Sequence, residues 1–180
     1  MRINANQTQA LVVDIQEKLY PHINNNEQLL ENTLTLIKGL KLLNIPFVLN
    51  EQYPKGLGHT IEPIKQLLID EKVYEKVTFS CCQTKETLEC IEQKSKKFVI
   101  VFGVEAHVCV LQSVLDLLET GFIPVLVTDC IDSRNSNDKR VSIDRMLQAG
   151  AIPTTYESLL FELCSSAKNG VFKEISKLIK

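Results

Sequence analysis

The chain alternates short apolar runs with longer segments whose apolar positions recur at helical spacing. The short runs predict strands at residues 9–15, 45–51, 72–77, 97–104, 123–130 and 151–156. The longer segments predict helices at residues 27–43, 61–70, 84–96, 105–121, 136–150 and 157–166. Strands that alternate with helices form βαβ units. The pattern therefore predicts an α/β protein with a three-layer Rossmann-like fold, in which a six-stranded, mostly parallel sheet carries helices on both faces.

The returns from helix to strand share a local signature. Ile-Pro begins three of the predicted strands, and Gly121 and Gly150 precede two of them. A glycine just past a helix takes the left-handed conformation cheaply, and a proline fits only the start or the edge of a strand. Because no linker or low-complexity tract interrupts this pattern, we expect a single domain over residues 1–180.

Composition narrows the possible classes of function. Hydrophobic residues make up 44% and charged residues 23% of the 180 positions, which is typical of a globular domain. The net charge of −2 disfavours nucleic acid as the main partner, so Lys94, Lys96 and Lys97 are interpreted as a solvated helix end. Residues 1–10 lack the apolar core of a signal peptide, and no apolar run reaches the ~18 residues that span a bilayer. We therefore expect a cytoplasmic protein without membrane contact.

The cysteines and glycines predict neither a disulfide framework nor a cofactor. Six cysteines in a cytoplasmic chain are expected to be reduced. The sequence lacks both glycine-rich phosphate-binding motifs, so no cofactor is predicted, and residues 55–60 are interpreted as a flexible loop or lid. His59 alone does not make a metal site, since a catalytic zinc needs about three protein ligands. We expect packing or surface roles for the thiols of Cys81, Cys82, Cys90, Cys130 and Cys164.

Reactive side chains follow several predicted strands. Open parallel sheets bind ligands beyond the carboxyl ends of their strands, and the residues found there are Asp14, Glu51, Lys76, Cys109 and Asp129. A carboxylate or a lysine at a buried strand end needs a partner. Asp14 and Lys76 could therefore serve as a general base and a charge beside a thiolate, or they could form a purely structural ion pair at the edge of the sheet.

Cys109 occupies the first turn of a predicted helix. The free N–H groups of a helix start stabilise a thiolate and would lower the pKa of the thiol. The alternative is a buried packing thiol, since cysteine is among the most buried residue types. His107 is a poor local partner, because residues two apart do not share a helix face.

Five segments in order resemble the isochorismatase-like cysteine hydrolases, in the branch of the isochorismatase domain-containing proteins. They are LVVDIQEKL, NEQYPKGLGHT, EKVTFSC, GVEAHVCVLQSVLDL and DCIDSRNSND, and the match runs over about residues 8–160. The resemblance implies a catalytic triad in which Asp14 is the general base, Lys76 its charged partner and Cys109 the nucleophile. It also implies a cis peptide bond between Val104 and Glu105, which would aim the N–H groups of Glu105 and Cys109 into an oxyanion hole.

The resemblance predicts acyl transfer through a thioester on Cys109. Nicotinamidases of this family carry an Asp-x-His metal motif that is missing here, so we expect a metal-independent hydrolase of a small amide or a related C–N bond. True isochorismatases cleave a vinyl ether without a cysteine nucleophile, so the presence of Cys109 argues against that reaction. Further residues that could line the pocket are Glu51, Tyr53, Phe79 and His107.

Two alternatives to the hydrolase remain open at this level. The chain could be a catalytically silent interaction protein that keeps the fold, or it could have the nuclease-like activity proposed for relatives, which its negative charge disfavours. The resemblance also implies a homo-oligomer, a dimer or a tetramer. Apolar positions on the last helices, within residues 159–164 and 171–179, could supply the interface.

Overall fold

A computed structural model describes all residues, 1–180. Its sheet has the order β3-β2-β1-β4-β5-β6, and every neighbouring pair of strands is parallel. The six-stranded Rossmann-like fold is confirmed, and the sheet is wholly rather than mostly parallel. The strands are β1 (Thr8–Val13), β2 (Phe47–Gln52), β3 (Val73–Lys76), β4 (Phe98–Val104), β5 (Ile123–Asp132) and β6 (Ile152–Thr154).

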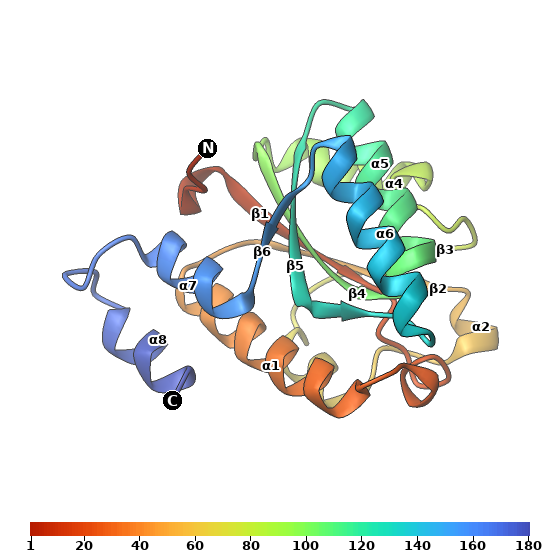
Figure 1. Cartoon of the computed structure of the whole chain (residues 1–180), viewed down its shortest axis with the longest axis horizontal. Coiled ribbons are helices and arrows are strands. Elements are labelled where there is room, and N and C mark those ends of the chain that lie inside the picture. Colours follow the sequence, from red (N-terminus) through yellow and green to blue (C-terminus); the bar gives the residue numbers. More distant parts are fainter.

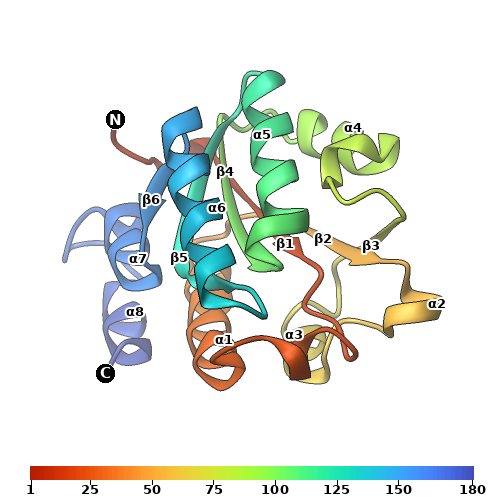
Figure 2. The same ribbon diagram turned by 45° about the vertical axis from the view of Figure 1, so that its right-hand side comes forward.

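Helices cover both faces of the sheet (Figure 1). One layer contains α4 (Lys85–Gln93), α5 (Leu111–Glu119) and α6 (Ser136–Ala149). The other contains α1 (Asn26–Leu42), α3 (Glu62–Leu67), α7 (Tyr156–Cys164) and α8 (Phe172–Leu178). The turned view in Figure 2 separates the two layers and shows α2 (Pro54–Leu57) at the far edge, beyond β3. None of these helices combines the length and the apolar character needed to cross a bilayer.

The central strands β1 and β4 are buried along their whole length. Both of their faces meet a layer of helices, which explains why their sequences are continuous apolar runs instead of an alternation of apolar and polar residues. The edge strand β3 is different, since Val73 is 39% exposed. The core of the domain therefore lies around β1, β4 and the first half of β5, and β3 extends from it toward solvent.

The structure differs from the predicted elements at two helical segments and at the end of β5. Residues 55–57, part of the loop predicted at 55–60, belong to the single turn α2. The helix predicted at 105–121 is divided into a π-helical turn, Ala106–Val110, and α5. Apolar periodicity covers both parts of that segment, so it does not reveal that the first turn is wound more loosely.

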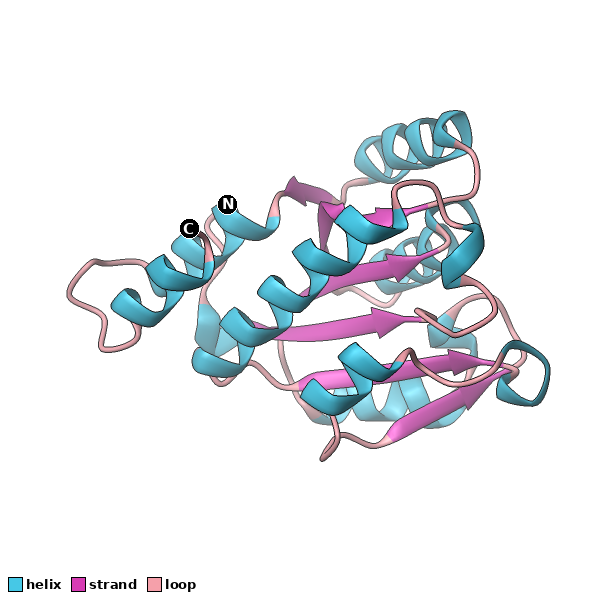
Figure 3. Cartoon of the chain, turned by 90° about the horizontal axis from the view of Figure 1, so that it is seen from below, coloured by secondary structure: helices cyan, strands magenta, loops and turns pink.

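The strand order reverses between β1 and β4. From β1 the chain adds β2 and β3 on one side of the sheet, and β4, β5 and β6 then follow on the other side. Neighbouring strands are all parallel, so their carboxyl ends gather at one edge, toward which most of the strand arrows in Figure 3 point. Gly103 in β4 faces Val13 in β1, and a Cβ atom on Gly103 would lie 2.0 Å from the Val13 carbonyl oxygen. Only glycine permits this approach and its φ of 126°. The glycine thus brings the ends of β1 and β4 together at the place where open sheets bind ligands.

Candidate active site

Asp14 and Lys76 form an ion pair at this edge. The Nζ atom of Lys76 lies 2.7 Å from Oδ2 of Asp14, and both side chains are completely buried. Asp14 follows β1 in the left-handed conformation, with φ of 50°. Lys76 ends β3, so its long side chain crosses the end of β2 to reach Asp14. Two residues that are 62 positions apart thus meet because parallel strands end side by side.

The second oxygen of the Asp14 carboxylate has no hydrogen-bond partner. Oδ1 is buried and accepts no hydrogen bond. The Cys109 thiol lies beside the carboxylate and lowers the pKa of Asp14, although the contact does not reach full hydrogen-bond geometry. Burial is the larger effect and raises the pKa of Asp14, which Lys76 offsets only in part. A desolvated carboxylate oxygen next to a thiol is arranged to accept its proton.

Cys109 lies in the π-helical turn and is 6% exposed. Burial raises the pKa of its thiol, and the charge of Asp14 raises it further, whereas Lys76 lowers it. The expectation that a helix start would lower this pKa is therefore wrong, because desolvation and a neighbouring carboxylate outweigh any effect of the helix terminus. The thiol is protonated at rest, so an attack by sulfur requires the proton to leave at the same time.

The turn before Cys109 is held by the loop that follows β5. The peptide bond between Val104 and Glu105 is cis. The carboxylate of Glu105 accepts the Arg134 backbone N–H at 3.0 Å and its Nε–H at 3.1 Å. Nδ1 of His107 lies 2.9 Å from the Ser133 hydroxyl. Glu105 and His107 therefore anchor the turn, and the oxyanion hole formed by the N–H groups of Glu105 and Cys109 stays a prediction.

Asp129 was predicted to end the fifth strand, and this is wrong. β5 runs on to Asp132 after a bulge, in which the register with β4 jumps from Leu126 to Ile131. Asp129 lies in this bulge, where its carboxylate accepts the Tyr156 N–H at 3.0 Å. Asp129 thus holds the first residue of α7 and makes no contact with the ion pair of Asp14 and Lys76. The polar pair Thr128 and Asp129 after an apolar run has the pattern of a strand end as well as of a bulge, so the sequence does not distinguish the two.

The four side chains expected to line the pocket have different surroundings. Glu51 is buried, and Oε1 accepts both the N–H and the hydroxyl of Thr60 while Oε2 meets His59 at 3.0 Å. Tyr53 and Phe79 are each 53% exposed, and His107 is half-buried. Both oxygens of the Glu51 carboxylate thus bind residues of the loop after α2. For Tyr53, Phe79 and His107 a place in the pocket stays a prediction.

Two residues at this edge carry no obvious signal in the sequence. Gln52, the last residue of β2, accepts a hydrogen bond of 2.7 Å from Lys76. Cys81 is completely buried, as a packing thiol would be, and a charge on it would raise the pKa values of both Lys76 and Cys109. The Ser113 hydroxyl links the two segments, since it accepts the Cys81 N–H and donates to the Cys109 carbonyl. Burial raises the pKa of Cys81, so this second thiol stays protonated.

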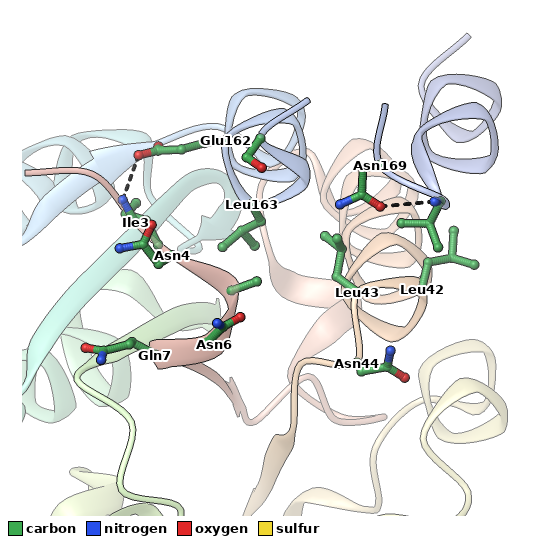
Figure 4. Close-up of a pocket in the computed structure, with 13 residues that line it drawn as sticks. Ile3, Asn4, Asn6, Gln7, Leu42, Leu43, Asn44, Glu162, Leu163 and Asn169 are labelled. Carbon is green, nitrogen blue, oxygen red and sulfur yellow. Dashed lines mark hydrogen bonds between the residues drawn. The ribbon is translucent and has the colours of Figure 1, made fainter. Parts of the chain in front are cut away.

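Two surface cavities lie at opposite edges of the sheet, and Lys76 of the ion pair is among the residues that line one of them. A cavity of about 560 Å³ opens beside Lys76 and is lined by Tyr53, Val77 and Thr78 among others. A larger one, about 710 Å³, lies at the opposite edge of the sheet, between the segment before β1 and the start of α8 (Figure 4). Asn4, Asn44, Glu162 and Asn169 are among its lining residues, none of which belongs to the predicted site. Nowhere does the structure gather three or more His, Cys, Asp or Glu side chains that could hold a metal ion.

Known proteins share both the sequence and the fold. The Isochorismatase domain family matches residues 8–158. Isochorismatase family protein 1A of Dictyostelium discoideum is 38% identical over 98% of this chain and 87% of its own. The structure of MAR1 ribonuclease from Caenorhabditis elegans superposes with a TM-score of 0.93 at 37% identity, covering 99% of this chain and 92% of that one.

A further structure extends the comparison to oligomers. The YcaC gene product of Escherichia coli, described as an octameric hydrolase of unknown specificity, superposes with a TM-score of 0.95. It is 25% identical, and the match covers 99% of this chain and 89% of that one. The resemblance deduced from the sequence motifs is confirmed by these matches.

Proposed function

The chain belongs to the Isochorismatase domain family, and from this premise we propose that it is a metal-independent cysteine hydrolase of small amides or related C–N bonds. One observation carries the proposal: a buried, lysine-paired Asp14 keeps one oxygen without a hydrogen-bond partner, and its carboxyl group neighbours the protonated thiol of Cys109. A buried ion pair is weak support for stability as such, because desolvation offsets the attraction. A pair with one unsatisfied carboxylate oxygen is better explained by proton transfer.

The arrangement supports the following sequence of steps. Asp14 Oδ1 takes the proton from Cys109 as Sγ forms a bond to the substrate carbonyl carbon, and the carbonyl oxygen becomes negative. That oxygen would be met by the N–H groups of Glu105 and Cys109, each worth about 3 kcal/mol of barrier. Collapse breaks the C–N bond, and Asp14 returns the proton to the leaving nitrogen. Water then attacks the thioester with Asp14 as base, which releases the acid and restores the thiol.

The decisive experiment compares wild type with Cys109→Ala across small amides, ureas and esters. We expect hydrolysis of at least one substrate, reduced by about 10³-fold or more in the variant, because the nucleophile is lost. Cys90→Ala is the matched control, since Cys90 is a partly exposed thiol outside the site. Iodoacetamide labelling followed by peptide mapping gives an independent measure. If Cys109 reacts no faster than the other thiols and Cys109→Ala hydrolyses as wild type does, the chain is instead a silent interaction protein.

A ribonuclease is the second candidate, because one relative of 37% identity is described as the MAR1 ribonuclease. The net charge of −2 counts against it. Binding of RNA through phosphate contacts would weaken steeply with salt. A salt titration of RNA binding and cleavage therefore separates the two candidates, and a flat response or no cleavage would leave the hydrolase.

We also propose that the protein forms a homo-oligomer and works in the cytoplasm. The octameric relative of E. coli supports assembly. Phe161 in α7 is 37% exposed, which leaves apolar surface on the last helices for an interface. One relative of 37% identity, from Phytophthora sojae, is a secreted effector, so the compartment is to be tested by fractionation. Sedimentation velocity distinguishes a monomer from a dimer, tetramer or octamer.

A further inference from the structure

The ammonium group of Lys76 has no hydrogen left for a substrate. It offers three N–H donors, and four oxygens lie within reach: Asp14 Oδ2 at 2.7 Å, Gln52 Oε1 at 2.7 Å, and the carbonyls of Phe79 at 3.0 Å and Thr78 at 3.3 Å. Lys76 therefore acts on the triad through its charge and its position. The groups that accept its hydrogen bonds fix that position.

Gln52 ends β2, the strand that lies between the two strands leading to the members of the ion pair. It pairs in register with Lys76 across β2 and β3, and β2 separates β3 from β1, which leads to Asp14. The side-chain amide is oriented by two contacts, since its nitrogen donates to the Val77 carbonyl at 3.0 Å while its oxygen meets Lys76. Gln52 is thus the one side-chain acceptor of the ammonium besides Asp14, and it is uncharged.

A second glutamine holds the backbone of Gln52. Oε1 of the completely buried Gln16 accepts the Gln52 N–H at 2.7 Å, and its Nε2 donates to the Gln52 carbonyl at 3.0 Å. The same Nε2 donates to the Gly58 carbonyl at 2.7 Å, in the segment predicted as a lid. Gln16 therefore connects the segment after α2 to the residue that contacts the triad lysine.

We infer that Gln52 is a positioning residue of the triad: its neutral amide oxygen aims the Lys76 ammonium at Asp14 without competing for its charge, and Gln16 locks this contact to the segment around Gly58. This inference rests on the proposed triad. The important property of Gln52 is that the oxygen that accepts the Lys76 hydrogen bond is uncharged. A carboxylate in the same place would share the ammonium and stand near Asp14 as a like charge, which disfavours ionisation of Asp14.

The other ionisable groups around the pair are few. Lys76 senses Asp14, Cys81 and Cys109, and Asp14 additionally senses Glu51. A substitution at Gln52 leaves all four of these side chains in the protein. A change in the pH dependence of Cys109 reactivity after such a substitution would therefore report on the Lys76–Asp14 pair.

The test is the pH profile of Cys109 alkylation by iodoacetamide, read by mass spectrometry on the full chain, which needs no substrate. For Gln52→Glu we expect the acidic limb to move to higher pH by about one unit, so that the rate below the limb falls about tenfold. Gln93→Glu adds the same charge at an exposed position of α4 and should leave the limb in place. Gln52→Met removes the acceptor without adding charge, and should lower the plateau several-fold with no upward shift.

The outcomes separate this inference from the proposed function. The inference is overturned if the acidic limb lies at the same pH in Gln52→Glu, Gln93→Glu and wild type. It is also overturned if Gln52→Met shifts the limb upward as far as Gln52→Glu does, because that result points to general disruption of the site. If Gln52→Glu does not fold, an unchanged plateau in Gln52→Met, with a native circular dichroism spectrum, overturns it as well. Asp14→Asn tests the triad itself: if the profile ignores this change, the proposed function fails, whatever Gln52 does.

Discussion

The two edges of the same sheet differ in how they treat polar side chains. At the carboxyl edge, Asp14 and Lys76 are buried without exposure and one carboxylate oxygen is unpaired. At the amino edge, the larger hollow is lined by amides such as Asn4 and Asn6, which are exposed to solvent. The comparison shows that the size of a cavity is a poor guide to chemistry here. Groups removed from water carry interactions of several kcal/mol, whereas solvated groups of similar type carry little.

Exchanging one lysine at each edge should give the largest contrast. Lys76→Met leaves the Asp14 charge buried and unpaired, which we expect to lower the free energy of unfolding by about 3–5 kcal/mol. Lys96→Met at the amino edge removes only an exposed contact with the Asn6 carbonyl, and should cost no more than about 0.5 kcal/mol. Urea titrations followed by circular dichroism measure both. Equal losses would mean that the buried pair has no special energetic weight.

Gly103 sharpens the comparison by testing how tightly the carboxyl edge is assembled. Gly103→Ala places a methyl group against the Val13 carbonyl, and we expect it to cost about 2–4 kcal/mol through strain and displacement of β1. Gly121 also has a positive φ, of 85°, but open space around it. Gly121→Ala should therefore cost only about 1 kcal/mol, the penalty of the left-handed backbone. Thermal unfolding of both variants isolates the steric part.

The ion pair also predicts how stability depends on pH. Burial lowers the pKa of Lys76, but the charge of Asp14 and its hydrogen bond to the ammonium outweigh burial and raise the pKa above its ordinary 10.5. A raised pKa means that this contribution is complete below 10.5 and is lost as the pH rises through the value in the folded protein. Wild type should therefore lose more stability than Lys76→Met between neutral and strongly alkaline pH. Denaturant titrations across this range measure the difference, and parallel curves would contradict the assignment.

The smallest effect is expected at the amino edge itself. Glu162 accepts the Ile3 N–H at 2.7 Å, and an amide oxygen can take over this contact. Glu162→Gln should change the free energy of unfolding by less than about 0.5 kcal/mol, and the alkylation rate of Cys109 by less than about twofold. A larger effect on alkylation would show that the two edges are coupled, and would remove the contrast drawn between them.

Local patterns specified most of the fold. Continuous apolar runs marked β1 and β4 because both of their faces are covered, and the helical stripes marked α1 and α5. The sequence did not predict the π-helical turn, which keeps the apolar pattern of the helix around it, or the bulge of β5, whose polar residues have the pattern of a strand end. Asp129 was misplaced for that reason: an acidic residue after an apolar run resembles a strand end whether or not the strand continues.

The candidate site divides in the same way. Asp14, Lys76 and Cys109 stand out in the sequence as polar residues next to apolar runs, and motifs placed them in a triad. Gln52 and Cys81 do not stand out, because glutamine and cysteine are common in many surroundings. Their importance depends on which atoms meet them, and this follows from the register of β2 with β3 and from the Ser113 bridge.

The sequence by itself determined the order of strands and helices along the chain and the family, and it supplied the three residues proposed for catalysis, because hydrophobic periodicity and motifs are local properties of the chain. Only the tertiary structure decided that Lys76 donates its hydrogen bonds to groups within the protein and that one oxygen of Asp14 has no hydrogen-bond partner. It also decided that the Cys109 thiol is protonated at rest. These properties depend on burial and on distances between segments far apart in the chain. Desolvation and charge act through space, so no local pattern records their balance.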